Sequence, residues 1–371
     1  MKDAAVCTSL PGDSTEPSAG RVVTLTSGTL ADGTLTGKTS GTGALVARGG
    51  EACPAEGSLA PKPVANGSTR GPAACPARSE AASGVGEPPP ELASSPNGQP
   101  RHVLLRQGAP SAAELAVDWS SAVLQALLRV AARPLLSGAW QATVRVAGVE
   151  KLAAGAWSEV CRHHDAKCDY LELEQPLEDG WKLVRQMLLA RRDRFLLLAD
   201  SAVGPPDARV PIEYQLHWPL AEGVACAWAE ESWEGWLVRG KQRQASVLPL
   251  ELPEWRAAWE DAALASTDGR LHLRQTARGR ALCAPLWFDL DRKRLRRALT
   301  WRRLTVGENL AVVPRDEAVG YRVQVGREQW LIYNSLAPVG NRSVLGLNTC
   351  AALVCGRFLP SGKIEEIVVI E

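Results

Sequence analysis

The sequence predicts an all-β fold, an antiparallel β-sandwich with one flanking N-terminal helix and a long disordered N-terminal segment. Short apolar runs separated by turn residues recur from residue 139 to the end of the 371-residue chain, as is typical of antiparallel sheets. All 13 Trp follow residue 118, whereas residues 1–100 contain no Trp, Tyr or Phe. One stretch near residue 115 has apolar residues at helical spacing.

Residues 1–100 are predicted to be a disordered, low-complexity segment. They consist mostly of Gly, Ser, Thr, Pro and Ala, so they have few large apolar side chains to bury. Without such burial, folding does not offset a backbone entropy cost of roughly 1–2 kcal/mol per residue. The Val, Leu and Thr residues between Arg21 and Val46 are compatible with one or two isolated strands.

Residues 101–135 are predicted to be a linker followed by an amphipathic helix over 111–133. Ser111 and Glu114 have the spacing of a capping box, and Pro134 ends the pattern. The apolar positions near helical spacing are Leu115, Trp119, Val123, Leu127 and Val130. The polar positions include only one Arg, so packing against the sheet is favoured over binding to a membrane surface.

Residues 136–371 are predicted to form the sandwich domain, built from two stacked antiparallel sheets. The expected strands cover 143–146, 170–174, 183–190, 195–199, 212–218, 271–275, 281–286, 321–325, 329–333 and 364–370. Two of them, 183–190 and 195–199, are almost continuously apolar, which is typical of strands buried on both faces. Trp255 and Trp259 are four residues apart and indicate a short helical turn within 253–264.

The strand over 212–218 is the first candidate site. Alternation places Glu213, Gln215 and His217 on one face and Tyr214 on the other. A carboxylate, an amide and an imidazole in one row can hydrogen-bond a sugar, and His217 is suited to act as a general base near neutral pH. The alternative is the solvent-facing side of an ordinary antiparallel sheet.

A basic segment over 292–303, RKRLRRALTWRR, is the second candidate site. Arginine forks bind sulfate and carboxylate groups in bidentate fashion, so this segment is a candidate polyanion site. The contacts expected from it are Arg294, Arg296, Trp301, Arg302 and Arg303. The alternative is a solvated strand edge, where positive charge prevents unwanted sheet pairing.

Two tryptophans, Trp233 and Trp236, lie among glutamates in CAWAEESWEGWLVRG and are candidates for stacking on sugar rings. The alternative is that they belong to the core of the sandwich, and residue parity places them on different faces of a straight strand.

One cluster contains residue types that bind metals: Cys161, His163, His164, Asp165 and Cys168. It lacks the second ligand pair of a structural zinc site, and His163 and His164 would point to opposite sides of an extended chain. A polar loop is favoured, so we predict no metal and no cofactor.

Nine Cys without regular spacing indicate reduced thiols rather than a secreted disulfide scaffold. The first 20 residues lack the apolar region of a signal peptide, and no apolar run approaches the roughly 18 residues of a membrane span. The net charge of +1 argues against general attraction to nucleic acid or membranes. The sequence therefore predicts a cytoplasmic chain with neither as a partner.

The order of features between 157 and 220 resembles the C-terminal β-sandwich of heparinase II/III-like polysaccharide lyases. These features are a strand with Arg185 and Gln186, an apolar strand that ends at Asp200, and a strand with His217 and Trp218. The resemblance covers roughly residues 136–371 and implies a supersandwich-like domain. In that family, β-elimination beside a uronic acid depends largely on an α/α-toroid that precedes the sandwich, and no helical pattern for a toroid is found here.

Two functional hypotheses follow from this resemblance. The leading one is a non-catalytic carbohydrate-associated module that binds an acidic polysaccharide. The alternative is a polysaccharide lyase, either a subunit whose toroid lies on a partner protein or a reduced enzyme that uses His217 with Tyr214 or Tyr170.

Overall fold

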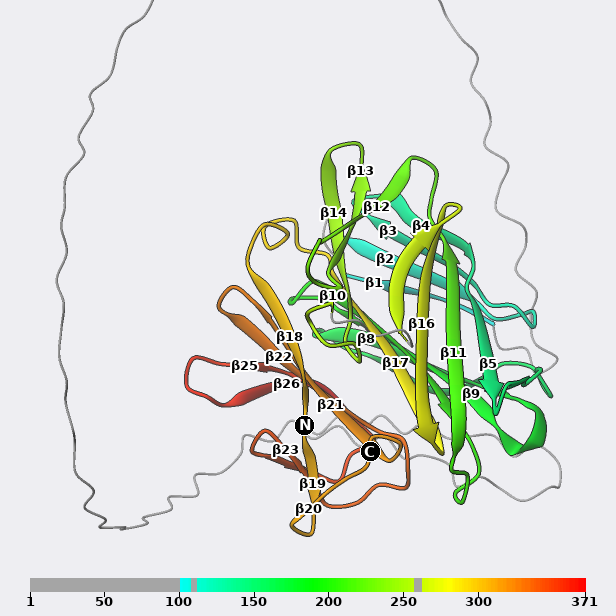
Figure 1. The fold of residues 1–371 in the computed structure, drawn as a ribbon. Coiled ribbons are helices and arrows are strands. Elements are labelled where there is room, and N and C mark those ends of the chain that lie inside the picture. Colours follow the sequence, from blue (N-terminus) through cyan, green and yellow to red (C-terminus); the bar gives the residue numbers. More distant parts are fainter. Residues whose placement is uncertain (1–100, 108–111, 257–261) are drawn as a thin grey trace, which may run out of the picture. The chain divides into compact units, whose positions relative to one another are not determined.

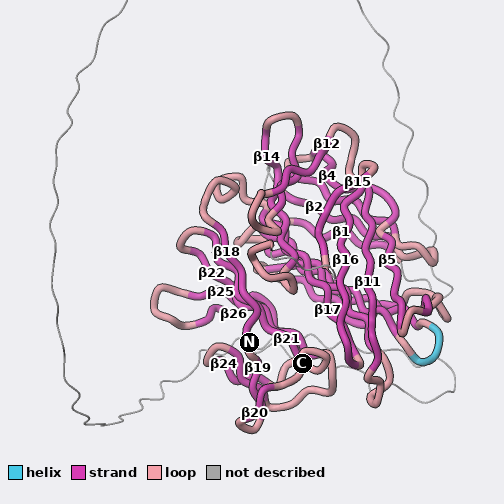
Figure 2. The backbone as a smooth tube through the Cα atoms, in the orientation of Figure 1, coloured by secondary structure: helices cyan, strands magenta, loops and turns pink. Residues whose placement is uncertain are grey.

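The computed structural model describes residues 101–107, 112–256 and 262–371, and its regular structure is almost all β-strand (Figure 1, Figure 2). The strands form antiparallel sheets of four, eight, five, five and four strands. The disorder predicted for residues 1–100 concerns a segment outside the described residues. Within the described ranges the helical structure is one short 3₁₀ turn, Glu178–Gly180, and no helix there is long and apolar enough to cross a bilayer.

The first sheet has the strand order β1-β2-β3-β4. Its strands are β1 (His102–Arg106), β2 (Ala113–Asp118), β3 (Gln125–Val130) and β4 (Arg133–Ala139). The helix predicted over 111–133 is therefore wrong.

Two-residue alternation explains why this segment is a sheet. Every second residue of β2 is buried from Ala113 onward, and β3 repeats this pattern up to Val130. The apolar residues that match helical spacing belong to different strands and their connections, and the shorter period of two decides the structure. Ala131 and Ala132 then form a two-residue connection to β4, with φ of 49° and 61°, the left-handed conformation that suits a tight hairpin.

The central sheet has eight strands in the order β12-β13-β14-β17-β10-β9-β8-β7. Its strands are β7 (Ser158–His164), β8 (Cys168–Pro176), β9 (Lys182–Ala190), β10 (Phe195–Val203), β12 (Val224–Trp228), β13 (Gly235–Arg239), β14 (Gln242–Pro249) and β17 (Ala281–Asp289). Every residue of β17 is buried, so this strand is covered on both faces, as its continuous apolar sequence requires. The predicted strands 183–190, 195–199 and 281–286 are confirmed.

One face of the central sheet is covered by the first sheet and by a five-stranded sheet of order β15-β16-β11-β5-β6. The strands of the latter are β5 (Gln141–Val146), β6 (Val149–Glu150), β11 (Val210–Pro219), β15 (Ala263–Thr267) and β16 (Arg270–Gly279). Leu115 of β2, Leu216 of β11 and Met187 of β9 belong to the shared core.

The opposite face is covered by a sheet of order β18-β21-β22-β25-β26, and a small sheet of order β20-β19-β23-β24 packs beside it. The strands are β18 (Leu299–Leu304), β19 (Val306–Glu308), β20 (Ala311–Val312), β21 (Ala318–Val325), β22 (Glu328–Ser335), β23 (Arg342–Val344), β24 (Leu347–Thr349), β25 (Leu353–Phe358) and β26 (Ile364–Ile370). Phe195, Trp287 and Trp330 form an aromatic cluster in this second core. The part of the chain that the structure describes thus has more sheets than the two predicted, because the central sheet is buried on both sides.

The helical turn predicted within 253–264 falls partly on 257–261, which are outside the described residues. In the described part of this segment, Trp255 forms an isolated β-bridge with Ser232, and Ala263 and Leu264 belong to β15.

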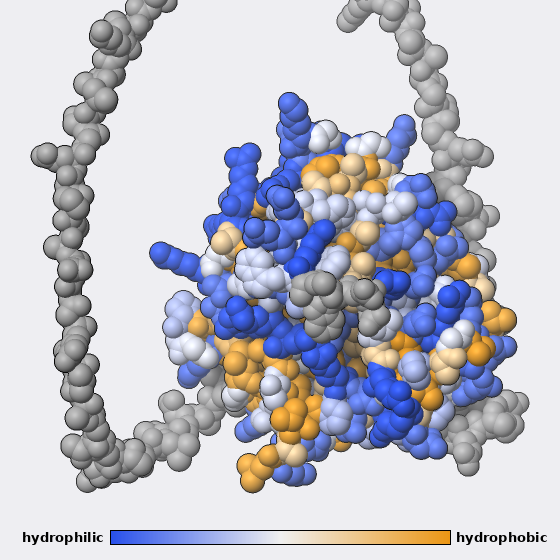
Figure 3. Space-filling model, in the orientation of Figure 1, coloured by the Kyte–Doolittle hydropathy of each residue, from blue (hydrophilic) through white to orange (hydrophobic). Residues whose placement is uncertain are grey.

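The face viewed in Figure 3 is largely hydrophilic, but hydrophobic side chains gather at the end where β19 and β20 lie. Leu310 and Val312 of this hairpin are exposed. This apolar tip differs in character from the polar outward face of the sheet that contains β11.

Candidate functional site

The outward face of β5, β11 and β16 carries a set of polar side chains, here called the polar face. Glu213, Gln215 and His217 all lie on it and are partly exposed, as the alternation along β11 predicts. Directly opposed residues of antiparallel strands share a face, so their partners lie there too. Read from β16 through β11 to β5, the rows are Thr276, Glu213 and Arg145; Arg274, Gln215 and Thr143; and His272, His217 and Gln141.

A shallow hollow of about 190 Å³ lies at the edge of the polar face. Gln215, His217, His272 and Arg274 contribute to its lining, together with small residues of the edge strand β15, Ala263 and Ala265. The alanines oppose Arg274 and His272 in the β15–β16 pairing, and their short side chains leave room beside these longer ones. The volume is below the roughly 300–1,000 Å³ of enclosed ligand pockets, so the hollow suits one unit of a larger ligand lying on the surface.

Two histidines meet in this hollow. The rings of His217 and His272 are 4.5 Å apart between centroids and nearly perpendicular. His272 Nε2 donates a hydrogen bond to the Thr267 carbonyl oxygen at 3.1 Å, which leaves Nδ1 without a proton in the neutral ring. Burial, followed by the charges of His272 and Arg270, lowers the pKa of His217 below its ordinary value. His217 is therefore a neutral hydrogen-bonding group at neutral pH.

Tyr214 lies on the opposite face of β11 from His217, so the structure does not bring these two residues together as a base and an acid. Its side chain is fully buried, and its hydroxyl donates to Asp200 Oδ2 at 2.5 Å. Asp200 also forms a bidentate ion pair with buried Arg185. Burial, with the Asp200 charge adding to it, raises the pKa of Tyr214 well above the ordinary value. Tyr214 therefore belongs to the core.

The other three tyrosines of the chain are also buried. These are Tyr170, Tyr321 and Tyr333. Tyr170 donates to Glu172 Oε2 at 2.5 Å, inside the second core. All four tyrosines of the chain lie within the described residues, and none of them is exposed on the polar face.

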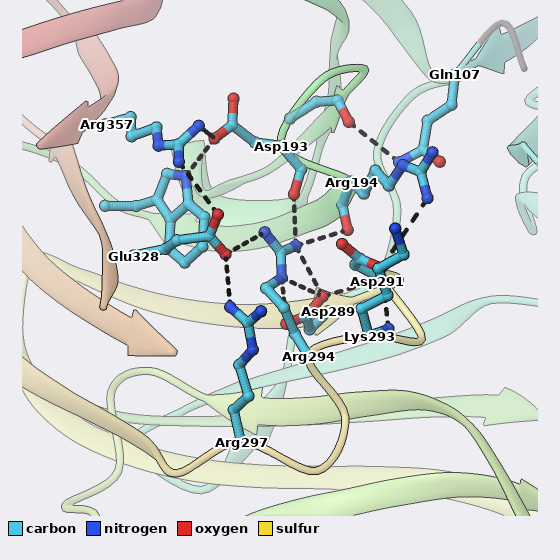
Figure 4. Close-up of polar contacts among 12 residues, drawn as sticks. Gln107, Asp193, Arg194, Asp289, Asp291, Lys293, Arg294, Arg297, Glu328 and Arg357 are labelled. Atoms are coloured by element: carbon cyan, nitrogen blue, oxygen red, sulfur yellow. Dashed lines mark hydrogen bonds and ion pairs between the residues drawn. The ribbon is translucent and has the colours of Figure 1, made fainter. Parts of the chain in front are cut away.

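Arg294, predicted to contact a polyanion, is a buried structural residue (Figure 4). Its side chain is 4% exposed and pairs with Asp289, with 2.8 Å between Nη2 and Oδ1. Nη2 also donates to the carbonyl oxygens of Asp193 and Arg194, and the guanidinium lies over the Trp330 ring at 4.9 Å from its centroid. Its charge is satisfied inside the protein, which corrects the prediction for this residue.

The other four predicted contacts of the basic segment differ in exposure. Trp301 is 2% exposed and donates its indole N–H to the Leu252 carbonyl oxygen. Arg303 pairs with Glu251 at 3.2 Å, whereas Arg296 and Arg302 are exposed. Only these two of the five predicted contacts are therefore open to a polymer.

Trp233 and Trp236 are partly buried and each is covered by an arginine. The Arg256 guanidinium lies 4.8 Å from the Trp233 ring centroid, and that of Arg243 lies 3.7 Å from the Trp236 ring centroid. Each ring therefore has one side occupied by a cation, which limits its use for sugar stacking. Glu234 lies between these two tryptophans in the sequence. Burial and the nearby Glu254 raise the pKa of its carboxyl group to about 7, although the positive charge of Arg243 acts to lower it.

Potential metal ligands gather on the β7–β8 hairpin. Among the described residues, His163, Asp165 and Cys168 bring their ligand atoms close together. The segment is two paired strands with a short turn, rather than the polar loop predicted. Cys168 belongs to the core on the side of the central sheet that faces away from β11, so this cluster is separate from the polar face.

His272 and Arg274 were not among the site residues predicted from the sequence. The alternation of polar and apolar residues in RLHLRQTARG indicates a strand with one outward polar face. The pairing of this strand with β11, and its register, are not visible in the local sequence. Both depend on contacts between residues roughly 55 positions apart in the chain.

No protein-family model matches the sequence, and a search of curated proteins finds no match either. Among solved structures, the chain is similar to a mutant of heparan sulfate lyase HepC from Pedobacter heparinus, with 12% identity and a TM-score of 0.46 over 68% of this chain and 44% of the lyase. A heparinase III is similar with 10% identity and a TM-score of 0.41, over 63% of this chain and 41% of that one.

A β-arabinopyranosidase is also similar, with 8% identity and a TM-score of 0.33, over 51% of this chain and 40% of the glycosidase. The chain spans less than half the length of the two lyases that it matches. These lyases are of the kind whose C-terminal sandwich the sequence resembles.

Proposed function

We propose that the chain is a non-catalytic carbohydrate-binding module whose polar face binds an acidic polysaccharide. The observation that carries the proposal is the hollow that Gln215, His217, His272 and Arg274 line together with the alanines of β15. Imidazole and amide groups hydrogen-bond sugar hydroxyls, and a guanidinium pairs with a carboxylate or sulfate in bidentate fashion.

The charge of the polar face favours an acidic ligand. Arg270 and Arg274 are both exposed on β16, next to the two histidines. Arg145 at the other end pairs with Glu150 at 3.7 Å. The outward side repeats every second residue, so successive rows are about 7 Å apart along the strands, and an extended polymer can contact more than one row.

A binding experiment with matched arginine variants tests this proposal. We expect Arg274→Ala to weaken binding of heparan sulfate about tenfold or more, since a charge-assisted hydrogen bond contributes roughly 1.5–3 kcal/mol. Arg302→Ala, an exposed arginine on β18, should leave affinity unchanged. Titration calorimetry with both variants, and with neutral dextran as a second ligand, measures this. Loss of binding in Arg302→Ala but not in Arg274→Ala would place the polymer on the basic segment and reject the polar face.

The alternative function is a polysaccharide lyase, or a subunit of one whose toroid lies on a partner protein. The lowered pKa of His217 favours it, because a neutral imidazole can accept a proton. Against a stand-alone enzyme, all four tyrosines are buried, so none is available as the acid. We expect no absorbance of unsaturated uronate when the purified chain is incubated with heparan sulfate, hyaluronan or alginate. Product formation that is lost in His217→Ala would instead establish the lyase.

A further inference from the structure

Strand β16 presents a regular series of basic side chains on the polar face. Its outward residues, in chain order, are Arg270, His272, Arg274, Thr276 and Arg278. Leu271 and Leu273, which alternate with them, belong to the core on the other side of the strand. Arg270, Arg274 and Arg278, here called the arginine stripe, are all exposed.

The arginines of the stripe are evenly spaced. Residues four apart on a strand are separated by about 13.5 Å, so the stripe is about 27 Å long. The interval exceeds the Debye length of about 8 Å at physiological salt, so the three charges repel one another only weakly. A small anion can contact one of these arginines at a time, whereas a linear polymer with anionic groups along its length can contact all three.

Protection of a sheet edge does not account for these charges. Positive charge on an edge strand prevents unwanted pairing. β16, however, pairs with β15 on one side and with β11 on the other, so neither of its edges is open. Among the residues that the structure describes, Arg270 and Arg278 form no ion pair. The stripe therefore has positive charge available for a ligand.

The neighbouring strands favour a polymer that runs along β16 rather than across the sheet. On β11, the residue opposite Thr276 is Glu213, a partly exposed carboxylate that repels an anionic polymer. On β5, the charge of Arg145 is paired with Glu150. β16 is the strand of the polar face that presents several positive charges and no negative one.

The composition of this surface suits a polysaccharide better than a nucleic acid. On β5, β11 and β16, which the structure describes in full, the outward side chains include no Trp, Tyr or Phe. Proteins that bind single-stranded nucleic acids usually provide aromatic rings on which the bases stack. The imidazole, amide and hydroxyl groups of the polar face instead suit the hydroxyl groups of sugars.

We propose that a linear acidic polysaccharide lies along β16 and contacts Arg270, Arg274 and Arg278 in turn. This inference rests on the proposed function, to which it adds the direction of the polymer and a further contact residue, Arg278. The hollow beside Arg274 then holds the middle of the bound segment. An oligosaccharide must span about 27 Å to make all three arginine contacts.

Titration of the full chain with heparan sulfate oligosaccharides of increasing length tests the direction. The affinity of the wild type should rise with length until the oligosaccharide spans the stripe. Arg278→Ala should weaken binding of long oligosaccharides about threefold or more. It should also reduce their salt dependence, since fewer counterions are released. An oligosaccharide too short to reach Arg278 from the hollow should bind both proteins equally, and Arg278→Lys, which keeps the charge, should bind long ones more tightly than Arg278→Ala.

Arg129→Ala is the matched control, because Arg129 is an exposed arginine on β3 of another sheet. It should bind every length as the wild type does, and the thermal midpoints of all variants should agree, since exposed substitutions change stability little.

Three outcomes would contradict the proposal in different ways. If Arg274→Ala weakens binding of long oligosaccharides but Arg278→Ala does not, the polymer crosses the strands and the proposed function stands. If neither variant weakens binding, the proposed function is wrong as well. Tighter binding of single-stranded DNA of the same length, reduced in Arg278→Ala, would assign the stripe to a nucleic acid.

Discussion

At the scale of single residues, the charged side chains that matter most for the fold are buried with a partner. Arg185 and Asp200 are each about 1% exposed and form a bidentate pair. Arg294 and Asp289 form a second such pair, and the Arg294 guanidinium lies over Trp330 of β22. The residue type alone does not show whether an arginine is buried or exposed. An arginine can be buried when the fold places a carboxylate beside it.

Replacing Arg294 with Ala is therefore expected to destabilise the protein strongly. The change leaves the Asp289 carboxylate buried without its cation, and breaking a buried pair in this way costs about 3–5 kcal/mol. Arg296→Ala, two residues away and exposed, should change the free energy of unfolding by less than about 0.5 kcal/mol. Urea denaturation of both variants measures the difference. Similar stabilities would show that Arg294 is not the buried half of a pair.

Glu234 is expected to make stability depend on pH. Its pKa of about 7 in the folded protein exceeds the ordinary value of 4.5, chiefly because the carboxyl group is buried. Between these two values the folded state holds a proton that the unfolded state has released. The free energy of unfolding should therefore fall as the pH rises from about 4.5 through about 7.

Glu234→Gln should remove this component, so its free energy of unfolding should vary less with pH than that of the wild type. Glu231→Gln, which changes an exposed neighbour, is the matched control and should follow the wild type. Denaturation at several pH values compares the three proteins. Parallel curves for all of them would mean that Glu234 does not hold its proton in the folded state.

At the scale of elements, the buried alternation of β2 and β3 favours a hairpin over a helix in the first sheet, despite the cost of the turn after β3. Ala131 and Ala132 both have positive φ, a conformation that costs a residue with a Cβ atom roughly 1–2 kcal/mol. The strands on either side compensate for this cost through their buried residues, which alternate along β3 and are Leu135 and Leu136 on β4. Because alanine favours a helix, Ala131 and Ala132 did not indicate a turn in the sequence.

The double substitution Ala131→Asn and Ala132→Gly is expected to stabilise the protein by about 1 kcal/mol, because Asn-Gly is the preferred pair for such a turn. In a helix the same change would destabilise by about 1 kcal/mol or more. Equilibrium unfolding in urea gives the sign directly. A matched change at Ala112 and Ala113, where Ala113 is in β2, should not stabilise.

Strands with continuous apolar runs or strict alternation were predictable from the sequence, as those at 183–190 and 212–218 show. The register between strands was not, because it depends on pairing between residues distant in the chain. The outward placement of Glu213, Gln215 and His217 followed from alternation along one strand. Their neighbours His272 and Arg274 required the β11–β16 pairing, and the burial of Arg294 required the approach of β22.

At the scale of the whole molecule, charge is balanced, with a net charge of +1. Attraction of a polyanion must then come from the local arrangement of charges rather than from their sum. On the polar face, Arg145, Arg270 and Arg274 are all exposed. In the basic segment, Lys293, Arg296 and Arg302 are exposed as well.

Triple alanine variants of these two sets change the net charge equally but at different places. If the polar face binds heparan sulfate, the variant at Arg145, Arg270 and Arg274 should lose affinity and most of its salt dependence between about 50 and 200 mM salt. The variant at Lys293, Arg296 and Arg302 should retain both. Affinities measured at the two salt concentrations decide the matter, and equal losses in the two variants would indicate attraction by total charge.

The position of β17 in the central sheet has a consequence for synthesis on the ribosome. β17 lies between β14 and β10, and both of these precede it in the chain. Ala281 pairs with Val203, so the partner of β10 is made almost 80 residues later. The ribosome adds roughly 5–20 residues per second, so one edge of the apolar strand β10 stays unpaired for on the order of 4–16 s before β17 is made. During this interval the nascent chain exposes a strand edge that other chains can join.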